Sequence, residues 1–370
     1  MSGHYERKKR PPSAGKILLI VLVVIVVLLA ALAIAIVIYY NSMLNKMNHV
    51  DVPDIVYTQA TTEATAATTS PTAETTQVTT VATTEPPHVP SSADYLNILL
   101  VGQASRDGEE ERFADTSILC TLNTYTKTLT MTSLLRDSFV KMPDYKGHYG
   151  GRIKLTTIYH LGSIYGDGPA GSMELMNMTL YNNFGIEVDH NFEVSFDAFI
   201  KVVDMLGGVD VELTEAEADY LNDDDVWVLY DVEPGPAHLD GMAALCYVRM
   251  RKAAGDNESD ITRTSRQRQV IESLLDKLKR RSLSTIQDIV NEVLPLVTTS
   301  MSNSEITDLL MTLIPMLPEL QIVDGGTCPA NYQGDSVDIY GDGVKHSVLR
   351  FDEAQTKKEM RAITEGEISE

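Results

Sequence analysis

The stretch "YLNILLVG" at residues 95–102 is the first of three short apolar runs that decide the fold of this chain. It is followed by "TSILCTLN" at 116–123 and "TLTMTSLL" at 128–135. Runs of this length, rich in β-branched and aliphatic residues and bounded by polar ones, are typical of strands in a sheet. The three runs therefore predict three consecutive strands at the start of a globular region.

Helical patterns alternate with further strands after these runs. The pattern predicts a helix over 169–184, entered at Pro169 and stopped at Gly185, and a second over 198–206 with Asp197 as its N-cap. Further strands are expected at 186–196 and 209–213, and further helices at 214–221, 241–248, 265–281, 285–299 (kinked at Pro295) and 304–317. This alternation predicts an α/β domain whose sheet lies between helices.

The composition is that of a folded chain. Its 370 residues are 44% hydrophobic, which is enough for one large domain or two ordinary ones. The three cysteines, Cys120, Cys246 and Cys328, are far apart and show no metal-ligand spacing. We expect buried free thiols at Cys120 and Cys246, whereas the Gly/Pro-containing loop around Cys328 leaves its pairing open.

The N-terminal segment has the pattern of a membrane anchor. Residues 17–38 are apolar without a charge or a proline, long enough for a helix that crosses a bilayer. Five cations against one glutamate precede it, so the positive-inside rule predicts a cytoplasmic N-terminus over 1–16, an anchor over 17–40 and an extracytoplasmic remainder. The alternative is a cleaved signal peptide, since "ALA" at 31–33 resembles a cleavage site.

A threonine-rich linker separates the anchor from the globular region. Residues 58–84 hold 13 threonines, and "EPPHVP" follows at 85–90. Such a composition buries little apolar surface, so residues 41–93 are expected to form an extended, solvated stalk. We place the main domain at 94–318 and a C-terminal extension of the same domain at 319–370.

A short stretch rich in arginine stands out in a chain with a formal net charge of −22. The stretch "ALCYVRMRKAAGDNESDITRTSRQRQV" at 244–270 holds five arginines. A helix is expected to begin near Thr264 in a capping box with Gln267, which would put Arg263 just before it and Arg266 in its first turn. Arginines at a helix N-terminus suit a bound phosphate, and salt bridges to nearby carboxylates are the alternative. The acidic surroundings and the expected extracytoplasmic location argue against a nucleic-acid role.

Seven segments, in order, resemble the LytR-CpsA-Psr phosphotransferases of bacterial cell envelopes. They are "NILLVGQ" (97–103), "RFADTSIL" (112–119), "TSLLRDSFV" (132–140), "RIKLTTIYHLGS" (152–163), "FEVSFDAFIKVVDMLGGVDVEL" (192–213), "LDGMAALCYVRMR" (239–251) and "DITRTSRQRQ" (260–269). The resemblance implies an α/β/α sandwich with a central mixed sheet, preceded by one transmembrane helix. It also implies an enzyme that moves a glycopolymer from a polyprenyl-pyrophosphate carrier to peptidoglycan, with Mg²⁺ as cofactor.

The resemblance assigns roles to particular residues. The pyrophosphate-binding arginines of the family match four catalytic candidates, namely Arg136, Arg249, Arg251 and Arg263. Substrate-binding positions match Lys154, Arg266 and Gln267, and a magnesium ligand matches Asp115. Arginine suits this task because it stays charged and binds two phosphate oxygens at once.

One position departs from the family pattern. Ala104, in "GQASRD", stands where the family has a second magnesium-binding aspartate, and a methyl group cannot bind a metal. Asp107 is the candidate replacement, although Glu109, Glu110 and Glu111 are equally available. The chain is therefore expected to be either a transferase, with reduced activity if no carboxylate compensates, or a non-catalytic pyrophosphoryl-lipid or glycan binding protein. A third hypothesis is a transcriptional regulator, but the predicted membrane anchor argues against it.

Overall fold

The computed structural model describes residues 41–55, 92–103, 112–223, 231–250, 260–316 and 318–366. The chain divides into two compact units, residues 1–46 and 47–370. In the described part of the first unit, residues 41–44 are helical. The elements below belong to the second unit.

A seven-stranded sheet forms the centre of the second unit, in the order β1-β10-β7-β2-β3-β4-β11. Its strands are β1 (Asn48–His49), β2 (Tyr95–Gln103), β3 (Ala114–Asn123), β4 (Thr128–Leu134), β7 (His190–Ser195), β10 (Val297–Thr299) and β11 (Gln321–Cys328). β3 is antiparallel to β2 and β4, whereas β2 pairs with β7, and β4 with β11, in parallel. The sheet is therefore mixed, and β2, β4, β7 and β11 all end at one edge, called here the carboxyl edge.

Nine helices and three hairpin-like strand pairs complete the described part of this unit. The strand pairs are β5 (Phe139–Lys141) with β6 (Arg152–Lys154), β8 (Val209–Leu213) with β9 (Gly235–Leu239), and β12 (Tyr332–Val337) with β13 (His346–Phe351). The helices are α2 (Leu155–Tyr165), α3 (Gly168–Phe184), α4 (Phe196–Met205), α5 (Glu215–Leu221), α6 (Gly241–Arg249), α7 (Asp260–Lys279), α8 (Leu283–Val293), α9 (Asn303–Met316) and α10 (Glu353–Thr364).

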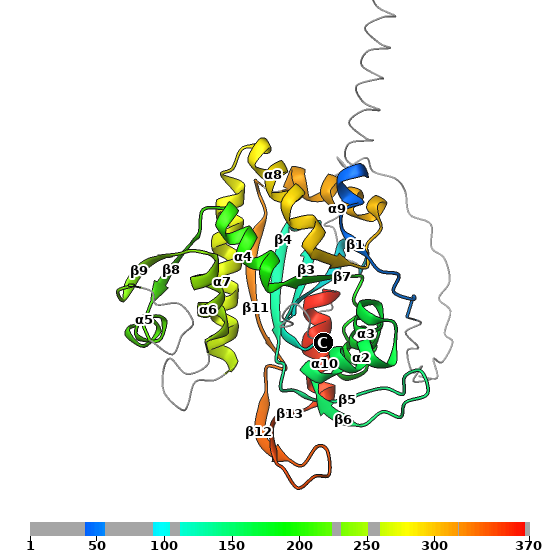
Figure 1. The fold of residues 1–370 in the computed structure, drawn as a ribbon. Coiled ribbons are helices and arrows are strands. Elements are labelled where there is room, and N and C mark those ends of the chain that lie inside the picture. Colours follow the sequence, from blue (N-terminus) through cyan, green and yellow to red (C-terminus); the bar gives the residue numbers. More distant parts are fainter. Residues whose placement is uncertain are drawn as a thin grey trace, which may run out of the picture. The chain divides into compact units, whose positions relative to one another are not determined.

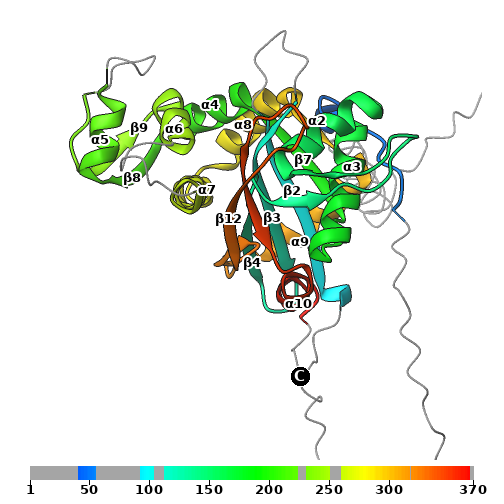
Figure 2. The same ribbon diagram turned by 90° about the horizontal axis from the view of Figure 1, so that it is seen from below.

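Side-chain alternation assigns the two faces of the sheet to different helices. Leu99 and Val101 of β2 join a buried apolar cluster that includes residues of α2 and α3. Gly102 lies on the opposite face and pairs with Thr116 of β3, which accepts a hydrogen bond from Gln267 of α7. Figures 1 and 2 show α2 and α3 on one side of the sheet and α7 on the other. The predicted α/β fold with a central mixed sheet is confirmed.

Local sequence signals placed most elements correctly. The three opening strands are confirmed as β2, β3 and β4. Helix α3 begins at Gly168 with Pro169 in its first turn and ends before Gly185, which has φ +71°. Glycine fits this position because a left-handed residue there closes the helix without a Cβ clash.

Three local predictions were wrong. The N-cap of α4 is Ser195, whose hydroxyl accepts from the Ala198 amide, so Asp197 lies in the first turn instead. Helix α8 ends at Val293, because Pro295 lacks the amide hydrogen that would continue it, and a 3₁₀ turn and strand β10 follow. Helix α7 begins at Asp260 and not near Thr264.

The start of α7 changes the placement of the arginines. Arg263 is therefore inside the helix and Arg266 lies in its second turn.

The three cysteines form no disulfide bond with one another. Cys120, Cys246 and Cys328 are all free thiols, and Cys328 is the most deeply buried of them.

No helix among the described residues is long and apolar enough to span a membrane. The predicted anchor at 17–40 lies outside those residues.

Helices α2 and α3 pack closely at two glycines, which gives a stability prediction. A Cβ at Gly162 would collide with the backbone of Gly171 and Ser172. We expect Gly162→Ala to lower the free energy of unfolding by about 1 to 3 kcal/mol, because overpacking outweighs the better helix propensity of alanine. Urea denaturation measures this. Gly151→Ala is the control, since a Cβ there meets nothing within 4 Å; equal losses in both variants would refute the packing argument.

Candidate functional site

Arg136 follows β4 at the carboxyl edge of the sheet and lies beside two carboxylates. Its Nη1 donates to Oδ1 of Asp115 at 3.1 Å, and its Nε is 3.5 Å from Oδ2 of Asp137. The Arg136 side chain is 15% exposed, so these interactions are only partly screened by water. Two predicted site residues, Arg136 and Asp115, are thus brought together from strands β4 and β3.

A β-bulge gives Asp115 its position. Gly102 pairs with Thr116, but the next residue of β2, Gln103, pairs with Ala114, so Asp115 is an extra residue in β3. A β-bulge of this kind changes the direction of a side chain at the end of a hydrogen-bonded strand pair. The bulge therefore places the Asp115 carboxylate at the edge, within reach of Arg136.

Lys154 joins the same group through Asp137. Its Nζ donates to Oδ1 of Asp137 at 2.8 Å, and the two side chains are 21% and 22% exposed. The strand pair β5 and β6 sets this contact, because Lys154 pairs with Phe139 two residues after Asp137. We call Asp115, Arg136, Asp137 and Lys154 the arginine cluster.

Several hydrogen-bond donors at this edge point to an anionic ligand. Helix α2 begins here without a side-chain cap and without an acidic residue in its first turn, although its Leu155 and Thr156 amides donate to the Ser138 and Arg136 carbonyls. Among the described groups, none bonds to the buried Nε2 of Gln103, Nε of Arg112 or Oγ1 of Thr156. Buried polar atoms are nearly always satisfied, so unsatisfied ones next to a helix N-terminus suit acceptor oxygens from a ligand.

Helix α7 is tied to the same edge by Gln267. Its Nε2 donates to Oγ1 of Thr116 at 2.8 Å, next to Asp115 in the sequence. Position 263 lies one helical turn before Gln267, on the same face of α7. Gln267, which is predicted to bind substrate, therefore contacts the carboxyl edge through Thr116.

Arg249 reaches this edge from α6. Its guanidinium lies 4.6 Å from the ring centroid of Phe196, a cation–π distance. Phe196 directly follows Ser195, the last residue of β7, which pairs with Gln103 of β2. Arg249 therefore lies against the carboxyl end of β7, two strands away from β3, which carries Asp115.

Arg266 has a buried partner. It is 3% exposed, and its Nε donates to Oε1 of Glu217 at 2.5 Å while its Nη1 donates to the Met250 carbonyl. Burial by itself would raise the pKa of Glu217, but hydrogen bonds from Arg266 and from Thr214 more than offset this and lower it. Arg266, predicted to bind substrate, thus forms a buried ion pair that joins α7 to α5.

A second ionic group at the carboxyl edge was missed by the sequence analysis. Glu193 of β7 is buried, forms a close ion pair with Arg112, and accepts from the Tyr159 hydroxyl at 2.7 Å. Burial and the Glu193 charge raise the pKa of Tyr159 well above its ordinary value. The signal was available, because both Arg112 and Glu193 lie within segments that resemble the family.

The remaining predicted site residues lie outside the described part of the chain. Arg251, Asp107 and the substituted position Ala104 fall there, as does the side chain of Arg263. Within the described residues, no group of three or more His, Cys, Asp and Glu side chains could hold a metal ion.

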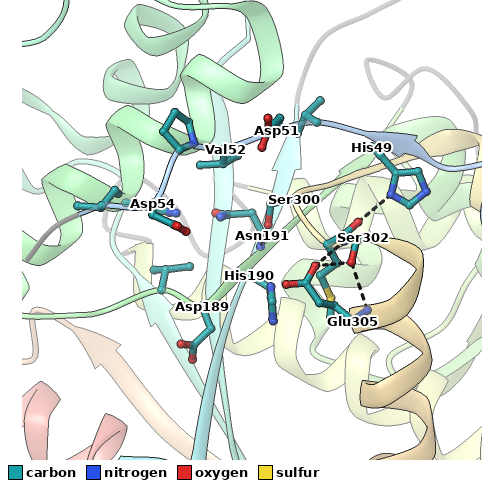
Figure 3. A pocket seen from close by; sticks show the side chains of 16 residues that line it. His49, Asp51, Val52, Asp54, Asp189, His190, Asn191, Ser300, Ser302 and Glu305 are labelled. Atoms are coloured by element: carbon teal, nitrogen blue, oxygen red, sulfur yellow. Dashed lines mark hydrogen bonds between the residues drawn. The ribbon is translucent and has the colours of Figure 1, made fainter.

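A cavity of about 760 Å³ lies at the other end of β7 (Figure 3). Its lining includes the carboxylates of Asp51, Asp54, Asp189 and Glu305. No lysine or arginine is among the described residues that line it. A cavity of this charge does not suit a pyrophosphate, so the arginine cluster remains the candidate site.

The chain is similar to known proteins both in sequence and in fold. The LytR_cpsA_psr family matches residues 55–321 of the chain. The chain belongs to the LytR-CpsA-Psr family. One relative in this family is the polyisoprenyl-teichoic acid–peptidoglycan teichoic acid transferase TagU of Oceanobacillus iheyensis, which is 31% identical over 221 residues. The match covers 60% of this chain and 62% of that relative's length.

Two solved structures share the LytR-CpsA-Psr fold. TagT bound to LIIa-WTA is 25% identical, with a TM-score of 0.54, over 76% of this chain and 93% of that one. YwtF (TagT) with bound octaprenyl pyrophosphate lipid is 23% identical, with a TM-score of 0.51, over 76% and 95%. The second likeness concerns the fold alone.

The Arg266–Glu217 pair gives a pH-dependent stability prediction. The folded pKa of Glu217 is below its ordinary value of 4.5, so the pair stabilises the fold fully above that pH and loses its contribution as the pH falls through the folded pKa. We expect Arg266→Ala to lower the free energy of unfolding by about 3 kcal/mol at pH 7, because it leaves a buried carboxylate unpaired.

Urea denaturation at pH 7 and at pH 3 checks this expectation. The difference between Arg266→Ala and the unmodified chain should shrink at pH 3. Lys201→Ala is the control, because Lys201 forms an exposed ion pair with Glu292 and should change stability by less than about 1 kcal/mol. A loss for Arg266→Ala no greater than that of the control would show that the pair does not stabilise the fold.

Proposed function

We propose that this chain is a membrane-anchored transferase that moves a glycopolymer from a polyprenyl-pyrophosphate carrier to peptidoglycan on the extracytoplasmic side. The names of its relatives support the proposal, since TagU is a teichoic acid–peptidoglycan transferase and TagT has been solved with LIIa-WTA and with octaprenyl pyrophosphate lipid. The apolar segment at 17–38 and the cations before it support the anchor and the topology.

The observation that carries the proposal is the arginine cluster with its surroundings. Arg136 and Lys154 are held at the carboxyl edge, beside buried polar atoms of Gln103, Arg112 and Thr156 that bond to no group among the described residues. Ligands of open α/β sheets bind outside the carboxyl ends of the strands. Phosphate oxygens suit these donors because they accept charge-assisted hydrogen bonds.

The proposed reaction is a phosphoryl transfer. A peptidoglycan hydroxyl attacks the phosphorus that carries the glycopolymer, a new P–O bond forms, and the hydroxyl loses its proton. The bridging P–O bond breaks, and polyprenyl phosphate leaves with the bridging oxygen and its electron pair. Negative charge grows on that oxygen, so fixed cations stabilise the transition state. Arg136, Arg249 and Arg263 would supply them, with Arg251 as the fourth.

The residues present fit a magnesium ion. Mg²⁺ is commonly held by one or two carboxylates together with substrate phosphates, and Asp115 and Asp137 both lie beside Arg136. Asp115 would hold the ion, with Asp107 as a further ligand. Bound there, the ion would neutralise charge on the phosphate oxygens.

A second candidate function is favoured by Ala104. Without the family aspartate at this position, the chain would bind a pyrophosphoryl lipid or its glycan and not turn it over. The arginines and the lysine at the carboxyl edge are needed for binding in either case. The two functions differ in whether polyprenyl phosphate is released.

Loss of Arg136, Arg249 or Arg263 should abolish transfer without unfolding the chain. We expect Arg136→Ala, Arg249→Ala and Arg263→Ala each to lower turnover by about 100-fold or more, because each removes charge stabilisation from the transition state. The measurement is the magnesium-dependent release of polyprenyl phosphate from a pyrophosphate-linked glycan by the full chain. Lys201→Ala should keep full turnover. If the arginine variants lose their cooperative thermal transition, these arginines are structural and the assignment fails.

The substitution Ala104→Asp separates the two candidate functions. For a transferase, the added carboxylate should lower the Mg²⁺ concentration for half-maximal release by about tenfold, because it adds a hard oxygen ligand. A chain that binds the lipid but releases polyprenyl phosphate only as Ala104→Asp would be a binding protein in its natural form. Ala104→Asn is the matched control, since its amide is neutral and a weaker magnesium ligand.

A further inference from the structure

The C-terminal extension begins where the family match ends. The match stops at residue 321, and β11 starts at Gln321. β11 then adds to β4 as the edge strand of the central sheet (Figure 1). The hairpin of β12 and β13 and the helix α10 follow. None of these elements received a role from the resemblance.

The extension contacts the chain immediately before and after Arg136. The Leu135 amide donates to the Cys328 carbonyl at 2.8 Å, at the end of β11. The Leu349 amide of β13 donates to the Asp137 carbonyl at 2.9 Å. Two backbone hydrogen bonds from the extension therefore enclose the turn that carries Arg136. Backbone bonds on both sides restrict the φ and ψ angles at Arg136, and with them the direction of its side chain.

Arg268 fastens the extension to α7. Its Nη1 donates to the Gly326 carbonyl at 2.9 Å and to the Ser133 hydroxyl at 3.2 Å, and its Nε is 3.3 Å from Asp324. The first and third partners lie on β11 and the second on β4. The Arg268 side chain is 11% exposed, so it makes these contacts away from bulk water.

A bulge in β11 makes this contact possible. Asp324 pairs with Met131 and Thr327 with Ser133, which leaves two glycines of β11 opposite one residue of β4. Gly326 has φ +71°, and its carbonyl accepts from Arg268. Glycine is favoured there because a side chain at this φ would be strained.

We propose that Arg268 is a positioning residue for the phosphate site and that the extension, residues 321–366, is the element through which it acts. Arg268 belongs to the same helix as Gln267, which contacts Thr116 at the carboxyl edge. By binding β11 and β4 together, it sets the distance between α7 and the Arg136 turn. The ligand class concerned is a pyrophosphate group, and the inference in this respect rests on the proposed function.

Substitution by lysine tests the role of Arg268. Lysine keeps the charge but cannot reach three partners with a planar fork. We expect Arg268→Lys to weaken the binding of inorganic pyrophosphate to the full chain, with Mg²⁺ present, by about tenfold in calorimetric titration. Asp324→Asn removes one charged partner and should weaken it by about threefold. It serves as the second variant if Arg268→Lys does not fold.

The control uses the other end of the same strand pair. Lys127, at the start of β4, forms an exposed ion pair with Glu319 just before β11. Lys127→Ala also disturbs the junction of these strands but lies away from the carboxyl edge. It should leave pyrophosphate binding within about twofold of the unmodified chain.

A double-mutant cycle separates positioning from general stabilisation. If Arg268 acts through Arg136, its substitution by lysine should change pyrophosphate affinity by less than about twofold when Arg136 is already lysine. Full additivity of the two effects would overturn the proposal. So would equal losses in Lys127→Ala and Arg268→Lys.

A ligand-free measurement keeps this inference distinct from the proposed function. In protein labelled with ¹⁵N-arginine, the Nε–Hε resonance of Arg136, assigned by its loss in Arg136→Lys, should shift in Arg268→Lys and not in Lys127→Ala. Failure of the unmodified chain to bind pyrophosphate would refute the proposed function. An unshifted Arg136 resonance would refute the positioning role whether or not pyrophosphate binds.

Discussion

The guanidinium of Arg136, held between the carboxylates of Asp115 and Asp137, is the interaction on which the rest of the site depends. A cation that must meet a phosphate has to be fixed in direction, and carboxylates on two sides fix it. Each carboxylate comes from a different element, so the arrangement exists only when β3 and β4 are paired in register. The bulge that exposes Asp115 is part of the same requirement.

The local charge explains how a strongly acidic chain can serve an anionic ligand. The arginine cluster contains two cations and two carboxylates, so it carries no large excess of positive charge when empty. Buried polar atoms of Gln103, Arg112 and Thr156, which bond to no group among the described residues, add hydrogen-bonding capacity for an anion, and the charge of Arg112 is balanced by Glu193. The opposite end of β7 is different, because the cavity there is lined by carboxylates. The two ends of the sheet therefore differ, because the carboxylates at the carboxyl edge are paired with cations and the cavity at the other end is lined by no lysine or arginine among the described residues.

Neighbouring arginines in one short stretch have different roles, and only their neighbours in space distinguish them. Arg249 lies on an aromatic ring at the end of β7, Arg266 pairs with Glu217, and Arg268 joins α7 to β11 and β4. The helix turns by about 100° per residue, so residues two apart face different parts of the protein. A sequence pattern that groups them by charge cannot assign these directions.

The sequence by itself determined the class of the fold, most of its helices and strands, and the family. Periodicity, glycine stops and capping residues act over a few positions, which is why β2, β3, β4 and α3 were predicted correctly. It also named Arg136, Asp115 and Lys154 through their motifs. Only the tertiary structure decided that Asp137 links Arg136 to Lys154, that Arg266 is buried against Glu217, and that the C-terminal extension encloses the Arg136 turn. These contacts join residues far apart in the chain, and their geometry follows from strand register and helix rotation, which no short stretch of sequence contains.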